Sequence, residues 1–297
     1  MRRREFMAAA LTTGLAASTR IVAMQPIQRS GPSILKLGLA AYSLRQHLKA
    51  APGSEGALDL IGFLDYCKKL GVGGAELTSY YFPSEVTPQY LNALKRHAHM
   101  AGLTICGGAI RNDFCQPPGE GLQKDLAHTE QWVNSYAELG APAIRIFAGK
   151  VPDGDSEDAA IARCIDAIGA ACETAGKRGV MLALENHGGV TAKAETMLKI
   201  VQAVDSPWFG VNLDSGNFTS GGDPYAELAM IAPYAINAQI KTDVVVDGKK
   251  TPADYGRIVQ ILRDANYSGW VVLEYEGAAP PYEAIPVEIE KIRAAIA

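Results

Sequence analysis

Acidic and amide side chains end four short apolar runs in the second half of the chain. In order they are Glu185, Asp214, Gln239 and Glu274. Alternate residues of a strand face the same side, so neighbouring strands would direct all four into one interior. Three carboxylates in one small cavity repel each other unless a cation lies among them. An all-oxygen donor set predicts a divalent metal, Mn²⁺ before Mg²⁺ or Co²⁺. Alternatively, some of these acids only pair with Lys241 or Arg145.

The first of these runs is the most informative. Residues 180–184 are all apolar and are followed by Glu185, Asn186, His187 and two glycines. A continuous apolar run of this kind predicts a strand buried on both faces, as in a parallel sheet. In α/β barrels the chemistry lies at the carboxyl ends of such strands. We therefore expect Glu185 at that end of a barrel.

Apolar runs alternate with helical patterns throughout the chain. Strict alternation predicts a parallel sheet, and eight repeats of about 30 residues predict a single (β/α)₈ TIM barrel over residues 33–297. An open doubly wound sheet is disfavoured, because no glycine-rich turn follows the first run. The expected strands are residues 35–41, 73–77, 103–109, 143–147, 180–185, 209–213, 236–240 and 270–273. The expected helices are residues 57–70, 88–101, 122–139, 157–175, 192–204, 225–231, 252–264 and 282–296.

The first 32 residues differ from the rest. Three arginines at positions 2–4 precede Phe6 and a short, mildly apolar run over residues 8–18. This pattern indicates a twin-arginine-type signal peptide and linker, and hence export to the periplasm; a disordered basic tail is the alternative. The apolar run is too short to span a bilayer, so we expect no stable membrane insertion.

Net charge and cysteine content limit the classes of partner and of cross-link that this chain is expected to have. The formal net charge of the 297 residues is -4 and the sequence pI is about 5.8, which does not favour nucleic acid as a partner. The five cysteines lack zinc-type spacing and five is an odd number, so buried free thiols are expected and no disulfide pair is evident.

Four short segments together resemble the xylose-isomerase-like barrel superfamily, especially its tagatose/psicose 3-epimerase and inosose-isomerase branch. They are residues 184–187, 212–217, 239–243 and 273–275. The resemblance implies one divalent metal held by Glu185, Asp214, Gln239 and Glu274. This chain departs from the family pattern at two positions. Gln239 stands where the family usually has histidine, and Asn217 stands where the epimerases often have histidine.

The resemblance also implies a reaction. The metal would stabilise an enediolate formed from a keto sugar or related polyol, with Glu185 and Glu274 as acid and base. The outcome would be isomerisation or epimerisation. A lyase or dehydratase acting on a 3-keto-glycoside or inosose is one alternative, and a non-catalytic exported sugar-binding barrel is another. Further substrate-binding candidates are His187, Asn217, Lys241, Tyr42 and Arg145.

The resemblance to sugar isomerases and epimerases also implies which molecules this protein binds. The expected ligand is a small carbohydrate, and a homo-oligomer is left open. Repair endonucleases share this superfamily, but their histidine-rich three-zinc sites and basic DNA faces have no counterpart in this chain.

Overall fold

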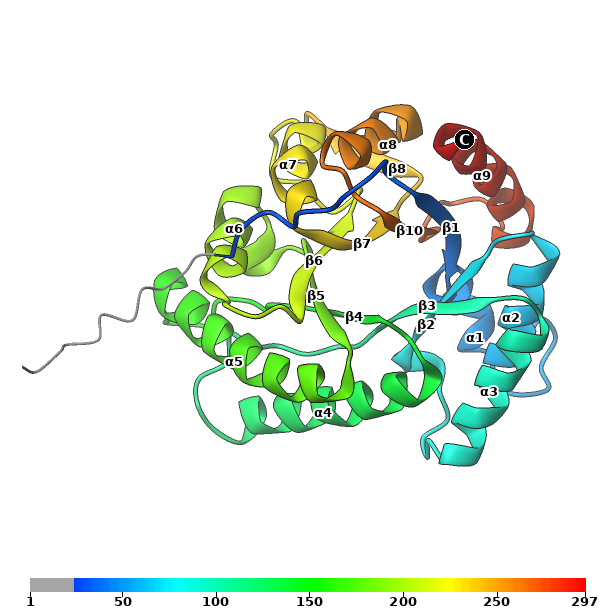
Figure 1. The fold of residues 1–297 in the computed structure, drawn as a ribbon, viewed down its shortest axis with the longest axis horizontal. Helices are drawn as coiled ribbons and strands as arrows, with labels where there is room; N and C mark the ends of the chain where they lie inside the picture. Colours follow the sequence, from blue (N-terminus) through cyan, green and yellow to red (C-terminus); the bar gives the residue numbers. More distant parts are fainter. Residues whose placement is uncertain (1–23) are drawn as a thin grey trace, which may run out of the picture.

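The computed structural model describes residues 24–297, which form a closed barrel of eight parallel strands in the order β1-β10-β7-β6-β5-β4-β3-β2 (Figure 1). This arrangement confirms the predicted single TIM barrel. The strands are β1 (Leu35–Ala40), β2 (Gly74–Thr78), β3 (Thr104–Ala109), β4 (Ala143–Ile146), β5 (Met181–Glu185), β6 (Phe209–Asp214), β7 (Ala235–Ile240) and β10 (Gly269–Leu273).

The longer helices surround the barrel, as Figure 1 shows. Side-chain caps fix several of their starts: Asp59 accepts from the Gly62 amide, and Ser156 from the Ala159 amide. Gly140 and Gly179 end two helices in the left-handed conformation. The helices are α1 (Arg45–Leu48), α2 (Leu60–Lys69), α3 (Pro88–Met100), α4 (Glu120–Leu139), α5 (Glu157–Arg178), α6 (Ala194–Ala203), α7 (Pro224–Ile231), α8 (Tyr255–Asp264) and α9 (Pro281–Ile296).

The sequence-based prediction missed the short helix α1 and a β-hairpin. A two-stranded antiparallel hairpin, β8 (Asp243–Val246) and β9 (Lys249–Pro252), lies between β7 and α8. Its turn is Asp247-Gly248, with φ of 50° and 73°. This Asp-Gly pair with positive φ is a hairpin signal in the sequence. Helix α8 therefore begins at Tyr255, after the Asp254 cap, instead of at residue 252.

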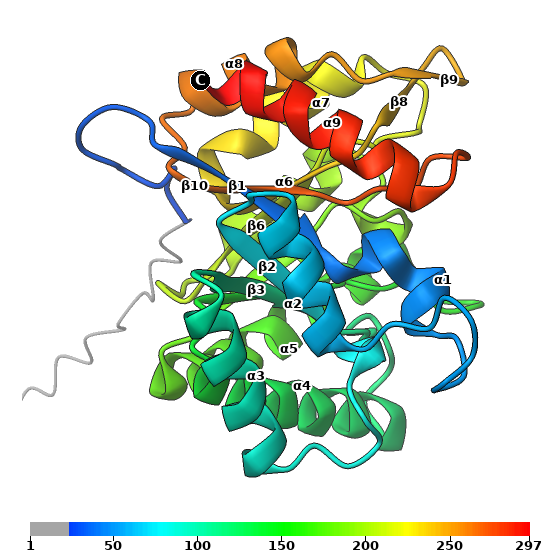
Figure 2. The same ribbon diagram turned by 90° about the vertical axis from the view of Figure 1, so that its right-hand side faces the viewer.

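Residues 24–32, predicted as linker, are bound to the barrel. The Met24 amide donates to the Gln202 carbonyl at 2.8 Å, and Arg29 lies over the Tyr267 ring. Figure 2 places this segment at the end of the barrel opposite α1 and the β8–β9 hairpin. The predicted twin-arginine motif lies outside the described residues, so periplasmic export stays a prediction.

Among the described residues, none of the helices has the length and apolar character needed to cross a membrane.

Candidate functional site

Glu185 ends β5 beside a buried arginine on β4. The Nε atom of Arg145 lies 2.8 Å from Oε2 of Glu185, and Asn217 donates to Oε1 at 2.9 Å. Burial raises the pKa of Glu185 to about 7, although Arg145 opposes that shift. Burial alone would lower the pKa of Arg145, but the Glu185 carboxylate raises it. This contact is the one expected under the alternative in which Arg145 pairs with one of the acids, and a substrate-binding role for Arg145 stays a prediction.

A lysine lies among the other carboxylates. The Nζ atom of Lys241 is 2.9 Å from Glu276, 3.1 Å from Glu274 and 3.6 Å from Asp214. The pairing of Ile240 with Leu273 brings Glu274 alongside Lys241. Burial opposes the charge of Lys241, yet these acids outweigh it and raise its pKa. Lys241 therefore carries the positive charge that the acid cluster requires in this structure.

Gln239 faces a different set of partners. Its Nε2 atom donates to Oε1 of Glu76 at 2.6 Å, and its Oε1 atom accepts from Asn212 at 2.6 Å. Asn237 donates to the second oxygen of Glu76 at 3.0 Å. All four side chains are buried. Gln239 thus belongs to a polar layer of the barrel interior that is centred on Glu76.

Glu76 is a site residue that the sequence analysis did not select. It lies in the middle of β2 as a lone carboxylate in an apolar run, which was the available signal. Its partners come from β7, far away in sequence, and become visible only once the barrel closes. Burial raises its pKa to about 7, and Glu274 adds to the shift.

Two of the predicted substrate-binding residues lie at the mouth of the barrel. Tyr42 is half-buried, and the Arg45 guanidinium lies 5.2 Å from its ring centroid. The ring of His187 packs against Phe147, with centroids 4.3 Å apart. The barrel mouth desolvates His187, and together with Arg145 this lowers its pKa to about 4, although part of the ring is exposed. A neutral imidazole is therefore expected at neutral pH.

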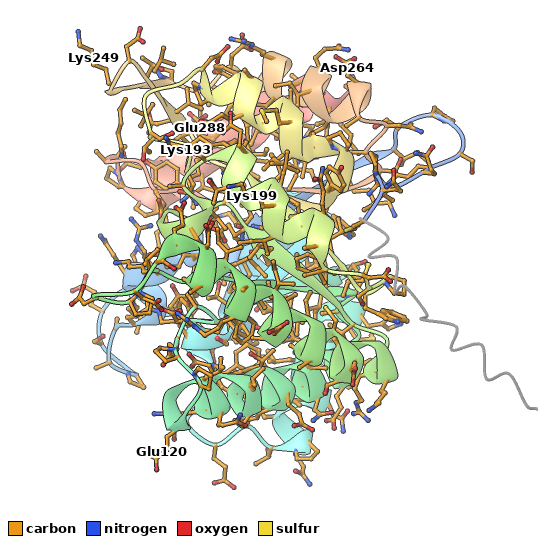
Figure 3. All side chains as sticks on the ribbon, turned by 90° about the vertical axis from the view of Figure 1, so that its left-hand side faces the viewer. Glu120, Lys193, Lys199, Lys249, Asp264 and Glu288 are labelled. Carbon is orange, nitrogen blue, oxygen red and sulfur yellow. The ribbon has the colours of Figure 1, made fainter. Side chains whose placement is uncertain are left out.

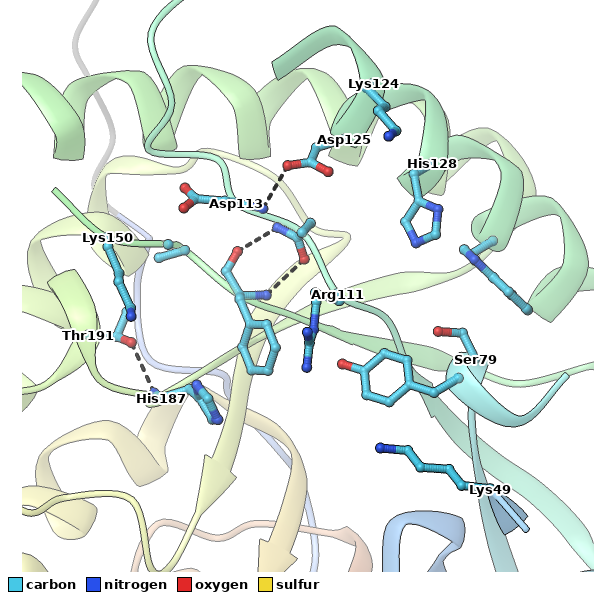
Figure 4. A pocket seen from close by; sticks show the side chains of 16 residues that line it. Lys49, Ser79, Arg111, Asp113, Lys124, Asp125, His128, Lys150, His187 and Thr191 are labelled. Carbon is cyan, nitrogen blue, oxygen red and sulfur yellow. Dashed lines mark hydrogen bonds between the residues drawn. The ribbon is translucent and has the colours of Figure 1, made fainter. Parts of the chain in front are cut away.

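A cavity of about 990 Å³ opens over the ends of β2 to β5 (Figure 4). His187 forms part of its wall, and its amide donates to Thr191 at 3.0 Å. The loops after β4 and β5 approach each other closely at the cavity. A Cβ atom added to Gly189 would lie only 2.1 Å from the Gly149 carbonyl oxygen. The other lining side chains include Lys49, Tyr80, Arg111, Lys124, Phe147 and Lys150.

The predicted metal ligands fit a cation only in part. The negative charge of Glu274 adds to the raised pKa of Glu185 and of Asp214, so a cation among these acids would be stabilising. Oδ2 of Asp214 is buried without a hydrogen-bond partner. Gln239, however, has both ends engaged with Glu76 and Asn212. Within residues 24–297, no three acidic, imidazole or thiol groups are arranged closely enough to hold a metal. A metal would have to displace Lys241, so the metal site stays a prediction.

Comparison with known proteins identifies the family. A family model described as "Xylose isomerase-like TIM barrel" matches residues 64–295. The chain belongs to this family. The family resemblance proposed from the four strand-end segments is thereby confirmed.

Individual relatives include several activities. The chain is 23% identical to the 3-oxo-isoapionate decarboxylase of Pectobacterium atrosepticum over 210 residues, which cover 70% of this chain and 68% of that protein. It superimposes on the D-psicose 3-epimerase of Clostridium cellulolyticum H10 with a TM-score of 0.73 and 16% identity, covering 88% and 99% of the two chains.

The 3-keto-D-glucoside 4-epimerase of E. coli superimposes with a TM-score of 0.68 and 17% identity, covering 88% of this chain and 99% of that one. At these identities the structural likeness establishes the fold and leaves the reaction open.

Proposed function

We propose that the protein is a divalent-metal-dependent isomerase or epimerase of a keto sugar or related polyol. The observation that carries the acid-base part of the proposal is the position of Lys241. Its ammonium group contacts Glu274 and lies 3.6 Å from Asp214, and the charge of Glu185 also acts on it. The two candidate acid-base groups, Glu185 at the end of β5 and Glu274 directly after β10, therefore both act on the same mostly buried lysine.

The chain's own residues suit proton transfer next to a carbonyl. Glu185 and Glu274 would act as the acid-base pair: one removes the proton on carbon, and the other returns one. Arg145 and Asn217 hold the Glu185 carboxylate at two different oxygens, which fixes its direction. Lys241 would donate hydrogen bonds to a sugar oxygen when it leaves Glu274.

A divalent ion would be held by Glu185, Asp214 and Glu274, with Gln239 joining only if its amide leaves Glu76. Such an ion would supply positive charge to the oxygens that become negative as the proton leaves. The support is the buried Oδ2 atom of Asp214, which accepts no hydrogen bond and has its ion-pair partner Lys241 3.6 Å away. Lys241 would then be released toward the substrate and Glu276, which lies 2.9 Å away.

A lyase is the second candidate, favoured by the relative named 3-oxo-isoapionate decarboxylase. In a β-keto acid, the bond to the carboxylate breaks and its electrons move onto the carbonyl. Carbon dioxide leaves, and one acid of the pair protonates the carbon left behind. This reaction passes through an enolate, which is an enediolate where that carbon carries a hydroxyl group, and it needs no initial proton abstraction.

The experiment is incubation with a panel of keto sugars and keto sugar acids in deuterated water, with Mn²⁺, followed by NMR. An epimerase or isomerase incorporates deuterium at a carbon beside the carbonyl and yields a sugar of unchanged mass apart from the label. A decarboxylase releases carbon dioxide. Binding of sugars without either reaction would favour the sugar-binding alternative.

A further inference from the structure

The cavity beside the acid-base pair has an excess of unpaired positive charge. Lys49, Arg111, Lys124 and Lys150 all line it (Figure 4). Within residues 24–297, none of the four takes part in an ion pair. Arg111 lies over the Tyr80 ring, 5.4 Å from its centroid, so its planar face is supported while its N–H groups stay available.

The loop between β3 and α4 supplies hydrogen-bond donors to both carboxylates in the same wall, Asp113 in that loop and Asp125 on α4. Oδ2 of Asp125 accepts from the Asp113 amide at 2.9 Å and from Gln116 at 2.6 Å. Oδ1 of Asp113 accepts from the Cys115 amide at 2.9 Å. These donors stabilise both charges, and neither acid forms an ion pair with the four cavity cations.

Direct contacts connect this cavity to the acid-base pair. Phe147 and His187 form part of its wall and pack against each other. The Arg145 guanidinium lies 3.9 Å from the Phe147 ring centroid, and its Nε atom contacts Glu185. A ligand that reaches from Glu185 past His187 would therefore meet the cationic wall.

We propose that the cavity binds an anionic group, a carboxylate or a phosphate, on the sugar whose reacting carbons lie at Glu185 and Glu274. The inference rests on the proposed function and adds its substrate class: sugar acids or sugar phosphates instead of neutral sugars. Arg111 supplies a planar pair of donors, and Lys49 and Lys150 add point charges. Figure 4 shows these three side chains among the residues that line the cavity.

The test compares three probes with similar six-carbon chains: D-glucitol, D-gluconate and D-glucitol 6-phosphate. Calorimetry at fixed ionic strength measures their affinities for the wild-type protein, Arg111→Gln and Lys150→Gln. Lys199→Gln is the control, because this exposed lysine lies on α6, outside the cavity (Figure 3). At least one anion should bind about tenfold tighter than glucitol. Each cavity variant should reduce that advantage about tenfold, the effect of losing a charged hydrogen bond, and the control should not.

The tighter of the two anions identifies the group as carboxylate or phosphate. The proposal is wrong if neither anion binds more tightly than glucitol, or if the control loses as much affinity as the cavity variants. Binding needs no turnover, so the result is separate from the proposed reaction. An enzyme that exchanges substrate protons without preferring anions would refute only the substrate class.

Discussion

Arg145 Nε and Glu185 Oε2 lie 2.8 Å apart in the barrel interior, with the two side chains only 6% and 3% exposed. Arg145 also donates to the Ile110 carbonyl at 2.6 Å, so its orientation is set by two partners. Arg145 therefore holds the Glu185 carboxylate in one orientation in the candidate site. Each residue compensates the buried charge of the other, so removing either one leaves a buried charge without its partner.

Replacing the arginine should therefore destabilise the protein strongly. Arg145→Gln leaves the Glu185 charge buried without its partner, and the expected loss in free energy of unfolding is about 3–5 kcal/mol. Arg257→Gln is the matched control, because Arg257 and Asp223 form a pair with both side chains about half exposed. The control should lose about 0–1 kcal/mol. Urea denaturation measures both, and equal losses would show that the buried pair has no special role.

The loop after β5 should not tolerate a side chain at its second glycine. Gly189 has φ of 53°, and its added Cβ would meet the Gly149 carbonyl oxygen. Gly189→Ala should lower the free energy of unfolding by at least about 2 kcal/mol, since the left-handed conformation alone costs about 1–2 kcal/mol.

The control for this change is another glycine to alanine substitution. Gly169 lies within α5, and its added Cβ would meet no atom within 4 Å. Gly169→Ala should stabilise the protein by about 0.5–1 kcal/mol, as expected in a helix interior. Thermal and urea unfolding of the two variants should shift in opposite directions. A shift in the same direction would contradict the close loop approach.

Metal binding should raise the free energy of unfolding and the Tm, because the ion binds the folded protein only. An ion at 100 times its dissociation constant adds about 2.7 kcal/mol, which corresponds to a rise in Tm of about 5 °C for a chain of this size. Added Mn²⁺ should produce this rise after chelator treatment, and Asp214→Asn should abolish it.

Asp223→Asn is the control for Mn²⁺ binding, because Asp223 caps α7 and pairs with Arg257 with its side chain about half exposed, and asparagine keeps the cap. The control should retain the full rise in Tm. Absence of any Mn²⁺ effect on the wild-type protein would indicate that Lys241 and Arg145 are the only cations of the site.

The thiols should be unreactive in the folded protein. All five cysteines are free and buried, and burial raises the pKa of Cys67 and Cys106. A thiol reagent should therefore label none in the native protein and five after unfolding in denaturant. Rapid labelling of a native cysteine would contradict the described packing, and labelling of three after unfolding would indicate a disulfide.

The barrel could be predicted from sequence because each strand and helix carries its own local pattern. Residues 180–184 are apolar throughout, as a doubly covered strand requires. The β8–β9 hairpin was missed because an eightfold repeat of strand and helix left no place for it. Its Asp247-Gly248 turn was the local signal that could have revealed it.

The site was only partly predictable, because its contacts depend on register across the barrel. Alternation predicted that Glu185, Asp214, Gln239 and Glu274 face one interior, and all four side chains are buried. Glu76 pairs with Gln239 only because β2 and β7 face each other across the closed sheet. Which cation meets Asp214 and Glu274 is likewise a property of side-chain packing, and Lys241 takes that position here.

In the proposed reaction, Glu185 and Glu274 exchange a proton on a sugar carbon. The most direct test is incorporation of deuterium into substrate by wild type, Glu185→Gln and Glu274→Gln, each loaded with Mn²⁺. Glu283→Gln is the control, because Glu283 is exposed on α9. Incorporation should fall at least about 100-fold in both site variants and stay unchanged in the control. Full exchange in either site variant would contradict the assignment of that residue as acid or base.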